Sequence, residues 1–229
     1  MPINTVFFDL DGTLADTAPD LAFALNGVLG EEGLRPLPFE TIRPVVSHGG
    51  VALIRLGFGI EPDHHDFERL RRRLLDIYKN NLATETALFP GMAELLVRIE
   101  ERGMKWGVVT NKPAWLTDPL MEALNLSSRA ASIVSGDTTS HRKPHPEPLH
   151  HACRLAGCIS GECVYVGDAE RDIEAGRRAG MRTVAALFGY LTDDDRPERW
   201  GADAMVTQPL DILDWINAWD ATDSTAATP

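Results

Sequence analysis

The sequence predicts an α/β fold: a doubly wound parallel sheet with an all-helical domain inserted close to the N-terminus. From Phe89 onward, short apolar runs rich in β-branched residues alternate with helical patterns, as in parallel sheets with right-handed crossovers. The stretch from Ala15 to about Thr86 reads as all helix and contains no strand candidate. The 229 residues suffice for one core together with a smaller inserted domain.

The chain opens with a strand candidate over residues 3–8, an apolar run of the kind that is buried in parallel sheets. The inserted helices follow, and we expect them at residues 19–29, from 39 toward 47, from 51, and at 66–82, with a Gly- and Pro-containing loop at 31–38. The two connections, near residues 13–17 and 84–89, are natural hinges. The insert can therefore serve as a lid over the end of the first strand.

The rest of the chain carries the remaining strands and helices of the sheet domain. We expect strands at residues 105–109, 132–135, 163–166, 182–187 and 204–207, and helices at 91–102, 115–124, 149–155, 173–179 and 210–219. The chain therefore divides into an α/β core of residues 1–14 and 87–219 and a helical cap of residues 15–86. Residues 220–229 are small and polar, and we expect a flexible tail.

Composition limits the partners of the protein. The formal net charge of −12 argues against nucleic acid or an anionic membrane, but a local site can still bind a phosphorylated small molecule. With no long apolar stretch and no export signal, we expect a cytoplasmic protein, as a monomer or homodimer. Cys153, Cys158 and Cys163 match no common zinc or redox spacing, so we expect reduced thiols that form no pairable set.

Two acids end the first strand, in the run Asp9-Leu10-Asp11-Gly12-Thr13. The period of two in an extended chain places Asp9 and Asp11 on the same side of the backbone. A buried strand that carries charge at its end needs compensation, which a divalent cation can supply. Ligands of open α/β sheets bind beyond the carboxyl ends of the strands. Gly12 permits a sharp turn that brings backbone amides close to an anion.

Three later segments bring polar residues to the same edge of the sheet. They are Thr110-Asn111-Lys112, Lys143-Pro144-His145-Pro146-Glu147-Pro148-Leu149 and Gly167-Asp168-Ala169-Glu170-Arg171-Asp172. Together with the first acidic run, they resemble the four motifs of the haloacid dehalogenase superfamily, over essentially the whole chain. Each motif alone is weak, but the set in this order is specific. The resemblance implies a Rossmann-like core with an inserted cap.

The resemblance also implies roles for the polar residues in phosphate-ester hydrolysis. Asp9 would be the nucleophile that forms an aspartyl-phosphate. Asp11 would act first as the acid that protonates the leaving oxygen and then as the base. Thr110, Asn111 and Lys143 would bind the phosphate, because its oxygens need hydrogen bonds and a compensating cation.

A magnesium ion is the cofactor that the resemblance implies. Mg²⁺ prefers a few carboxylate oxygens, with phosphate and water completing its octahedron. Asp9, the backbone carbonyl of Asp11, and Asp168 would supply the protein ligands. Asp172, one helical turn after Asp168, would orient a water molecule or Asp168, although a direct bond to the metal stays open.

Two segments of the insert bear on substrate binding. Ser47-His48-Gly49-Gly50 breaks the helical pattern and resembles the substrate-specificity segment of the cap; an ordinary turn between helices is the alternative. A run of arginines, Arg69, Arg71, Arg72 and Arg73, lies mostly on the polar face of the predicted 66–82 helix. We interpret this run as a solvated face without a function.

The second acid, Asp11, favours a phosphatase or phosphomutase over a dehalogenase. The leading hypothesis is a Mg²⁺-dependent phosphomonoester hydrolase of carbohydrate metabolism, similar to the bacterial phosphoglycolate phosphatases in residues 172–176, 189–190 and 200–203. A closely similar branch acts on N-acetylmuramic acid 6-phosphate, and both substrates carry a carboxylate. A sugar phosphomutase of the β-phosphoglucomutase type is a second hypothesis. A binding protein without activity is disfavoured because every catalytic position is intact.

Overall fold

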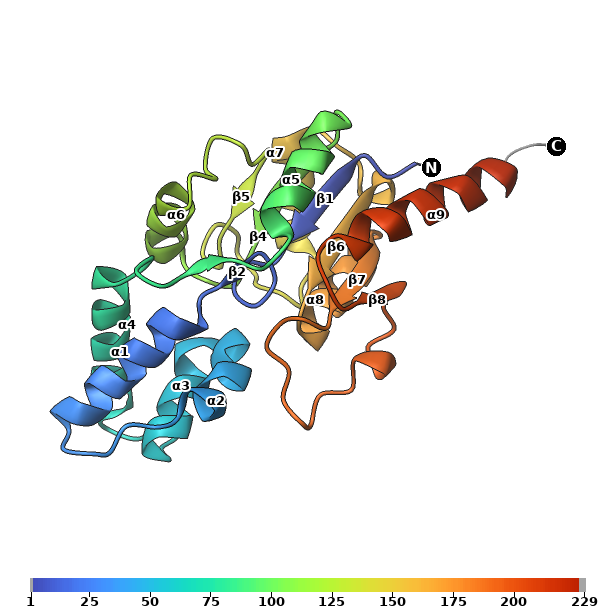
Figure 1. Ribbon diagram of the computed structural model, residues 1–229. Coiled ribbons are helices and arrows are strands. Elements are labelled where there is room, and N and C mark those ends of the chain that lie inside the picture. Colours follow the sequence, from blue (N-terminus) through green and yellow to red (C-terminus); the bar gives the residue numbers. More distant parts are fainter. Residues whose placement is uncertain (1, 227–229) are drawn as a thin grey trace.

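The structure, a computed structural model, describes residues 2–226, and of residues 222–226 the backbone only. Figure 1 shows a sheet domain with the helical insert beside it. The sheet has six strands in the order β5-β4-β1-β6-β7-β8, and every pairing is parallel. The strands are β1 (Thr5–Phe8), β4 (Lys105–Val109), β5 (Ile133–Val134), β6 (Cys163–Gly167), β7 (Arg182–Ala186) and β8 (Ala204–Val206). The predicted α/β fold with a parallel sheet and a helical insert is confirmed.

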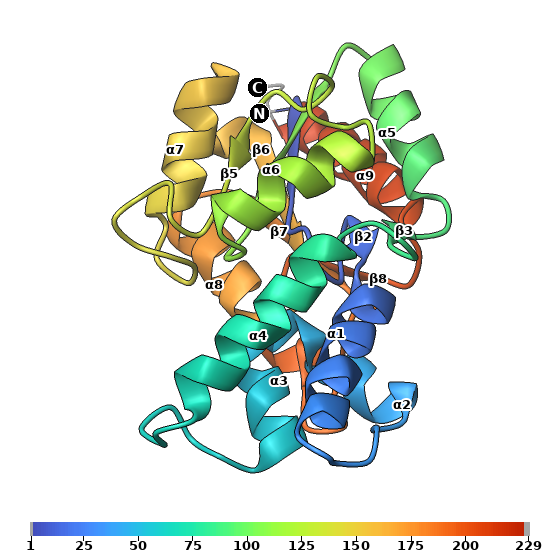
Figure 2. The same cartoon turned by 90° about the vertical axis from the view of Figure 1, so that its left-hand side faces the viewer.

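Helices cover both faces of the sheet (Figure 2). On one side lie α5 (Met92–Glu101), α6 (Ala114–Ala123) and α9 (Asp211–Ala226), and on the other α7 (Glu147–Ala156) and α8 (Glu170–Arg178). The alternation of β1 follows from this arrangement, because Val6 and Phe8 pack with the first group of helices and Phe7 with the second. All three side chains are fully buried, which explains the continuous apolar run in the sequence.

The register of the central strands brings the polar motifs to one edge of the sheet. Phe8 lies beside Val108 on β4 and Val166 on β6. One or two residues further along these three strands, the chain reaches Asp9, Thr110 and Asp168. Parallel strands end at the same edge, so residues separated by up to 159 positions meet there.

The insert consists of four helices and one 3₁₀ helix. They are α1 (Ala18–Glu31), α2 (Phe39–Ile42), a 3₁₀ helix (Arg43–His48), α3 (Gly49–Phe58) and α4 (Phe67–Asn80). Further 3₁₀ helices of the chain span Ser160–Glu162 and Pro197–Arg199. Leu25 and Leu29 of α1 and Leu74 of α4 are fully buried between the helices of the insert. The insert therefore has apolar packing of its own.

Two short strands join the insert to the core, and the sequence did not reveal them. β2 (Ala15–Asp16) pairs antiparallel with β3 (Ala87–Leu88). The prediction that no strand lies between Ala15 and Thr86 is therefore wrong at Ala15–Asp16. Two residues are too few to show an alternating pattern, and this strand exists only because of a partner 71 or 73 positions away.

The helical pattern continues through the segment that was expected to break it. Ser47 and His48 end the 3₁₀ helix, and α3 begins at Gly49 rather than at Val51. Gly49 has φ of 72°, a conformation that costs little for glycine, and it redirects the chain at this point. The chain therefore changes direction here without an intervening loop.

The C-terminal helix is longer than the sequence suggested. The predicted helix of residues 210–219 is too short, because α9 extends to Ala226 and includes the first seven residues of the predicted tail of residues 220–229. The backbone N–H of Ile3 donates a hydrogen bond of 3.0 Å to the Asp220 carboxylate, which ties this part of α9 to the start of the chain. Residues 227–229 of the predicted tail lie outside the described residues.

The three cysteines are free thiols, as expected, but they form a group that their spacing did not predict. The sulfur of Cys163 lies 3.9 Å from that of Cys153 and 3.5 Å from that of Cys158. Two of the three side chains are buried between α7 and the start of β6. The turn after α7 folds back to bring them together, and a linear spacing does not show such a turn.

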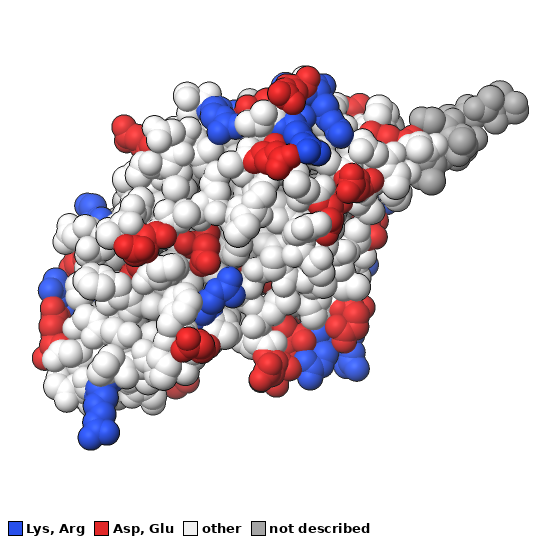
Figure 3. Space-filling view, in the orientation of Figure 1, with Lys and Arg blue, Asp and Glu red and all other residues white. Residues whose placement is uncertain are grey.

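The surface agrees with the acidic composition. Acidic side chains are spread over the face shown in Figure 3, with basic ones between them. Among the described residues, no helix is both long enough and apolar enough to cross a bilayer.

A buried carboxylate on α1 holds the second connection of the insert. Asp20 is 2% exposed and accepts hydrogen bonds from the backbone N–H groups of Glu85 and Thr86 and from the Thr86 hydroxyl, at 2.7–3.2 Å. We expect Asp20→Ala to lower the free energy of unfolding by about 1–3 kcal/mol, because buried donors lose their acceptor. Urea denaturation measures this, with Asp63→Ala at an exposed position as the control. Equal effects of the two substitutions would contradict the prediction.

Candidate active site

A cavity of about 720 Å³ lies between the cap and the carboxyl edge of the sheet. Its core end is lined by Asp9, Asp11, Thr110 and Asn111. Its cap end is lined by residues 46–51 and by one face of α4. The predicted catalytic motifs and the predicted cap segment therefore face the same space.

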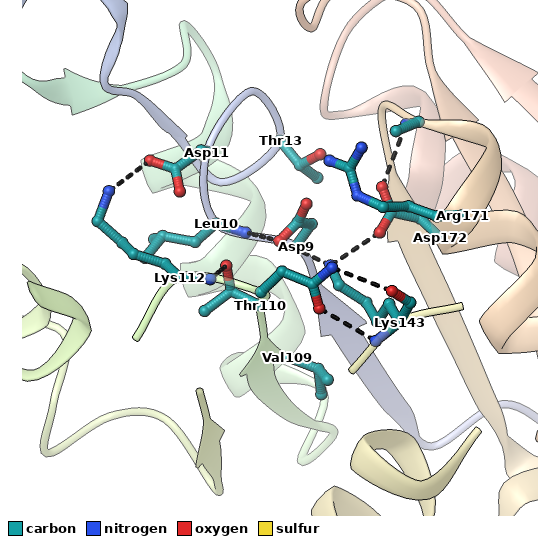
Figure 4. A network of polar contacts seen from close by, with 12 residues as sticks. Asp9, Leu10, Asp11, Thr13, Val109, Thr110, Lys112, Lys143, Arg171 and Asp172 are labelled. Carbon is teal, nitrogen blue, oxygen red and sulfur yellow. Dashed lines mark hydrogen bonds and ion pairs between the residues drawn. The ribbon is translucent and has the colours of Figure 1, made fainter. Parts of the chain in front are cut away.

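A buried lysine organises the core end of the cavity (Figure 4). The Lys143 ammonium lies 2.9 Å from Oδ1 of Asp9 and 2.7 Å from Oδ1 of Asp172. It also donates a hydrogen bond of 2.7 Å to the hydroxyl of Tyr165, which in turn donates to the carbonyl of Val109 at 2.6 Å. The ammonium group thus lies beside three oxygens, two of which belong to carboxylates. Because the Lys143 side chain is completely buried, its charge requires these partners.

The two oxygens of Asp9 have different surroundings. Oδ1 accepts a 2.7 Å hydrogen bond from the backbone N–H of Leu10, in addition to its ion pair with Lys143. In the described part of the chain, no donor contacts Oδ2, and Asp9 lines the cavity. One oxygen is therefore held in place while the other is available to a ligand.

Asp168 is also buried, and contacts from both the core and the cap hold it. Its carboxylate accepts hydrogen bonds from the hydroxyl of Thr13 at 3.3 Å and from the backbone N–H of Tyr190 at 2.9 Å. The hydroxyl of Ser47, in the cap, donates to the same carboxylate at 2.6 Å. Burial, followed by the negative charges of Asp9 and Asp172, raises the pKa of Asp168 to about 7.

Two glycines make room for Asp168. A Cβ on Gly12 would collide with the Asp168 carboxylate and would lie 2.8 Å from the Ser47 hydroxyl. Gly12 also has φ of 82°, so a side chain is disfavoured there on both grounds. A Cβ on Gly189 would collide with the Asp168 side chain as well. The turn after Asp11 and the loop after β7 are therefore fitted around this one acid.

Two of the predicted metal ligands, Asp9 and Asp168, form a single group with Asp172. Each of Asp9, Asp168 and Asp172 offers a carboxylate oxygen, and these oxygens all lie within 4.8 Å of one another. Burial raises the pKa of Asp172, although Lys143 opposes the shift. Three buried carboxylates exceed the single positive charge of Lys143. This donor set of hard oxygens with excess negative charge is the kind that fits Mg²⁺.

Asp11 is held by a different cation, one that the sequence analysis did not single out. Its Oδ1 lies 2.8 Å from the ammonium of Lys112 and accepts a 2.6 Å hydrogen bond from the Thr17 hydroxyl. Lys112 also donates to the hydroxyl of Tyr78 on α4, at 2.9 Å. Burial lowers the pKa of Lys112, but Asp11 and Tyr78 more than offset this and raise it above its usual value. Burial raises the pKa of Tyr78 to about 12, so its hydroxyl stays protonated.

The two residues after β4 differ in what they can offer to a phosphate. Oγ1 of Thr110 accepts a 3.2 Å hydrogen bond from the backbone N–H of Lys112, which leaves its own proton free to donate. The amide of Asn111 instead forms two hydrogen bonds with the backbone of Lys143: the amide nitrogen donates to the carbonyl at 3.1 Å, and the amide oxygen accepts from the N–H at 3.0 Å. The Asn111 side chain, expected on the phosphate, thus holds the Lys143 loop.

The cap segment at residues 47–50 contacts the core through Arg171, which immediately precedes Asp172. The guanidinium donates to the carbonyl of Ser47 at 2.7 Å and lies 3.4 Å from Nδ1 of His48. Burial and the charge of Arg171 lower the pKa of His48. Ser47 donates to Asp168, and it also lines the cavity together with His48, Gly49 and Gly50, so the predicted substrate segment borders the space where a ligand would bind.

The sequence alone did not identify Lys112, Tyr165, Tyr78 or Arg171 as parts of the site. Lys112 and Arg171 stand inside the quoted motifs, so their position was a usable signal. Tyr165 and Tyr78 resemble ordinary core residues of a strand and a helix. Their hydroxyl groups become informative only once the fold places a lysine beside each of them.

The fold, with its acids at the end of the first strand, is that of a hydrolase. The family model for haloacid dehalogenase-like hydrolases matches residues 6–186, and the chain belongs to this family. The chain is 42% identical over 218 residues to an N-acetylmuramic acid 6-phosphate phosphatase from Pseudomonas putida, covering 95% of this chain and 98% of that protein. It is 45% identical over 206 residues to a phosphoglycolate phosphatase from Xanthomonas campestris, covering 90% and 93%.

Comparison with solved structures supports the same family assignment. The crystal structure of a predicted phosphoglycolate phosphatase from Haemophilus somnus superimposes with a TM-score of 0.81 at 26% identity, covering 93% of this chain and 97% of that one. The protein is therefore an enzyme, a phosphatase of the haloacid dehalogenase-like family.

Removing the charge of Lys143 should destabilise the fold, because the acids around it would lose their partner. In the absence of divalent metal, at neutral pH, we expect Lys143→Met to lower the free energy of unfolding by about 3–5 kcal/mol, because two buried carboxylates lose their partner. Lys79→Met, on the exposed face of α4, serves as the control and should change it by less than about 1 kcal/mol. Urea denaturation in a chelating buffer measures both. Similar losses for the two variants would refute a structural role for the Lys143 charge.

Proposed function

We propose that this phosphatase hydrolyses a small, carboxylate-bearing phosphate ester in a Mg²⁺-dependent reaction, through an aspartyl-phosphate on Asp9. The observation that carries the proposal is the asymmetry of the Asp9 carboxylate. Lys143 and the Leu10 N–H hold Oδ1, whereas Oδ2 has no described donor, and Asp9 lines the cavity. An oriented oxygen with one free side is what in-line attack on phosphorus requires.

The metal would be held by Asp9, the backbone carbonyl of Asp11, and Asp168. Bound there, Mg²⁺ would supply positive charge for the phosphate oxygens and offset the excess of buried carboxylates. Both oxygens of Asp172 are engaged, one by Lys143 and the other by the backbone N–H of Ala169 at 3.1 Å. We therefore assign Asp172 to holding Lys143 and the start of α8.

In the first step, Oδ2 of Asp9 attacks phosphorus, and the bond from phosphorus to the ester oxygen breaks. Asp11 gives its proton to that departing oxygen. Lys143 and the Thr110 hydroxyl stabilise the phosphoryl oxygens during the transfer. Asn111 contributes by positioning Lys143 through its two backbone hydrogen bonds.

In the second step, water replaces the alcohol. Asp11, now ionised, takes a proton from the water molecule, whose oxygen attacks phosphorus. The bond between phosphorus and Asp9 breaks, and inorganic phosphate is released. The ion pair with Lys112 and the hydrogen bond from Thr17 orient Asp11, and because only Oδ1 is engaged, Oδ2 is available for proton transfer.

We propose that the insert, residues 15–86, acts as a lid. The contacts of Ser47 with Asp168 and with Arg171 link it to the core beside the reacting groups. The paired strands β2 and β3 lie where the insert joins the core, so they are candidate hinges. Opening would break the Ser47 contacts and admit substrate.

For the substrate we propose either 2-phosphoglycolate or N-acetylmuramic acid 6-phosphate. The similar proteins from Xanthomonas campestris and Pseudomonas putida carry these two activities in their names. Both compounds combine a phosphate monoester with a carboxylate, so either one fits a site that has a phosphoryl end and a separate anion-binding end.

Replacing the nucleophile should end turnover. We expect Asp9→Asn to lower kcat at least about 1,000-fold, because an amide oxygen does not form the phosphoenzyme. Released phosphate is measured with 2-phosphoglycolate, N-acetylmuramic acid 6-phosphate and glucose phosphates, with and without Mg²⁺. Asp118→Asn, at an exposed position on α6, is the matched control. Persistent turnover in Asp9→Asn would show that another group attacks phosphorus.

Metal binding can be tested without any substrate. We expect Mg²⁺ at a hundred times its dissociation constant to stabilise the wild-type protein by about 3 kcal/mol. Asp168→Asn should lose most of this stabilisation, because it removes a ligand charge. Thermal denaturation with MgCl₂, compared with NaCl at equal ionic strength, reports the effect. An unchanged Mg²⁺ response in Asp168→Asn would place the ion elsewhere.

A further inference from the structure

One face of α4 lines the active-site cavity, and it includes part of the arginine run that looked like a solvated surface. The lining residues of this helix are Glu68, Arg71, Arg72, Leu75 and Asp76. Their spacing of i, i+3, i+4, i+7 and i+8 places them on a single face. The apolar face of the helix, buried inside the cap, is separate and consists of Phe67, Leu70, Leu74 and Tyr78.

Arg71 lies beside the cap segment that the sequence singled out. The position of a Cβ on Gly50 is 3.7 Å from Cγ of Arg71 and 3.9 Å from its Nε. The stem of the arginine therefore packs against the start of α3, with the guanidinium at the cap end of the cavity. Arg72, one position further, is exposed and borders the cavity from its outer side.

The present partner of Arg71 is a weak one. In the described part of the chain, its ion pair is with Glu68, 3.2 Å away and one helical turn earlier, and 36% of the arginine side chain is exposed. An exposed pair of this kind contributes little, so a ligand can replace it. Arg73 on the same helix has a different environment. It forms a two-pronged pair with Glu31 at 2.6 and 2.8 Å, away from the cavity.

The volume of the cavity leaves room for a second recognition element. The phosphoryl group of a substrate would occupy the end formed by Asp9 and Thr110. Cavities of about 300–1,000 Å³ hold ligands of drug or sugar size, and this one, at about 720 Å³, extends well beyond a phosphate. Arg71 is among the cap residues that line the remaining space, and its planar guanidinium suits bidentate binding of a carboxylate.

We propose that Arg71 is a specificity residue that binds the carboxylate of the substrate, and that the cavity is shaped for a carboxylate-bearing sugar phosphate. This inference depends on the proposed function for the identity of the phosphoryl end. In this proposal the cap binds the part of the substrate that does not react and so determines specificity.

Binding to a non-turnover protein tests the inference independently of catalysis. In the Asp9→Asn background with Mg²⁺, calorimetry compares N-acetylmuramic acid 6-phosphate with N-acetylglucosamine 6-phosphate, which lacks the carboxylate, and 2-phosphoglycolate with ethyl phosphate. We expect Arg71→Gln to raise the Kd of each carboxylate-bearing ligand by about 10- to 100-fold and to leave its carboxylate-free counterpart unchanged. Arg71→Lys should recover part of the loss. Arg73→Gln is the matched control and should have no effect.

The ligand pairs also separate the two substrate sizes. If the site is shaped for a sugar, the carboxylate should lower the Kd more between N-acetylglucosamine 6-phosphate and N-acetylmuramic acid 6-phosphate than between ethyl phosphate and 2-phosphoglycolate. The inference is overturned if Arg71→Gln weakens both members of a pair equally, if Arg73→Gln has the same effect, or if the carboxylate gives no gain to the parent protein. These outcomes concern binding, whereas failure of the proposed function would appear as absent phosphate release in the protein with Asp9 intact.

Discussion

The site depends on one buried ammonium group. Lys143 holds Asp9 and Asp172 at 2.9 and 2.7 Å in a place that solvent does not reach. Removing such charges from water costs several kcal/mol per ion, so the arrangement exists only if each charge has partners. The partners are Tyr165 on β6, the carbonyl of Val109 at the end of β4, and Asn111 two residues after β4. Several residues of the core thus act together, through Lys143, to orient the carboxylate of Asp9.

The parallel sheet makes the burial of these charges possible, because it places their partners at the same edge. β1 lies in the centre, so the segments after β4 and β6 flank Asp9 directly. Gly12 and Gly189 then let two loops close around Asp168 without a collision. Each of these features concerns a backbone position rather than a reactive side chain. Substitution at either glycine would therefore disturb the geometry of the site before it changed any of its chemistry.

The sequence predicted the parts of the site that follow from strand ends and missed the parts that depend on partners. Asp9, Asp168 and Lys143 could be found because motif order and strand topology jointly determine where they lie. The hydrogen bonds of Asn111 with Lys143 and of Ser47 with Asp168 could not be predicted. The first depends on the path of a loop and the second on the position of the cap. The strand at Ala15–Asp16 was missed for the same reason, since only its pairing with β3 defines it.

The cap and the core are in contact through the groups to which we assign the chemistry. Ser47 touches Asp168, and Tyr78 of α4 touches the lysine that holds Asp11. Any motion of the cap must therefore change the surroundings of both acids. If a distant part of the substrate binds to the cap, the energy of that contact favours the closed arrangement, in which the acids are held and water is limited. Under these proposals, specificity in the cap and reactivity in the core would be two consequences of one closure, and a helical insert placed directly after the turn at Asp11 is positioned to link them.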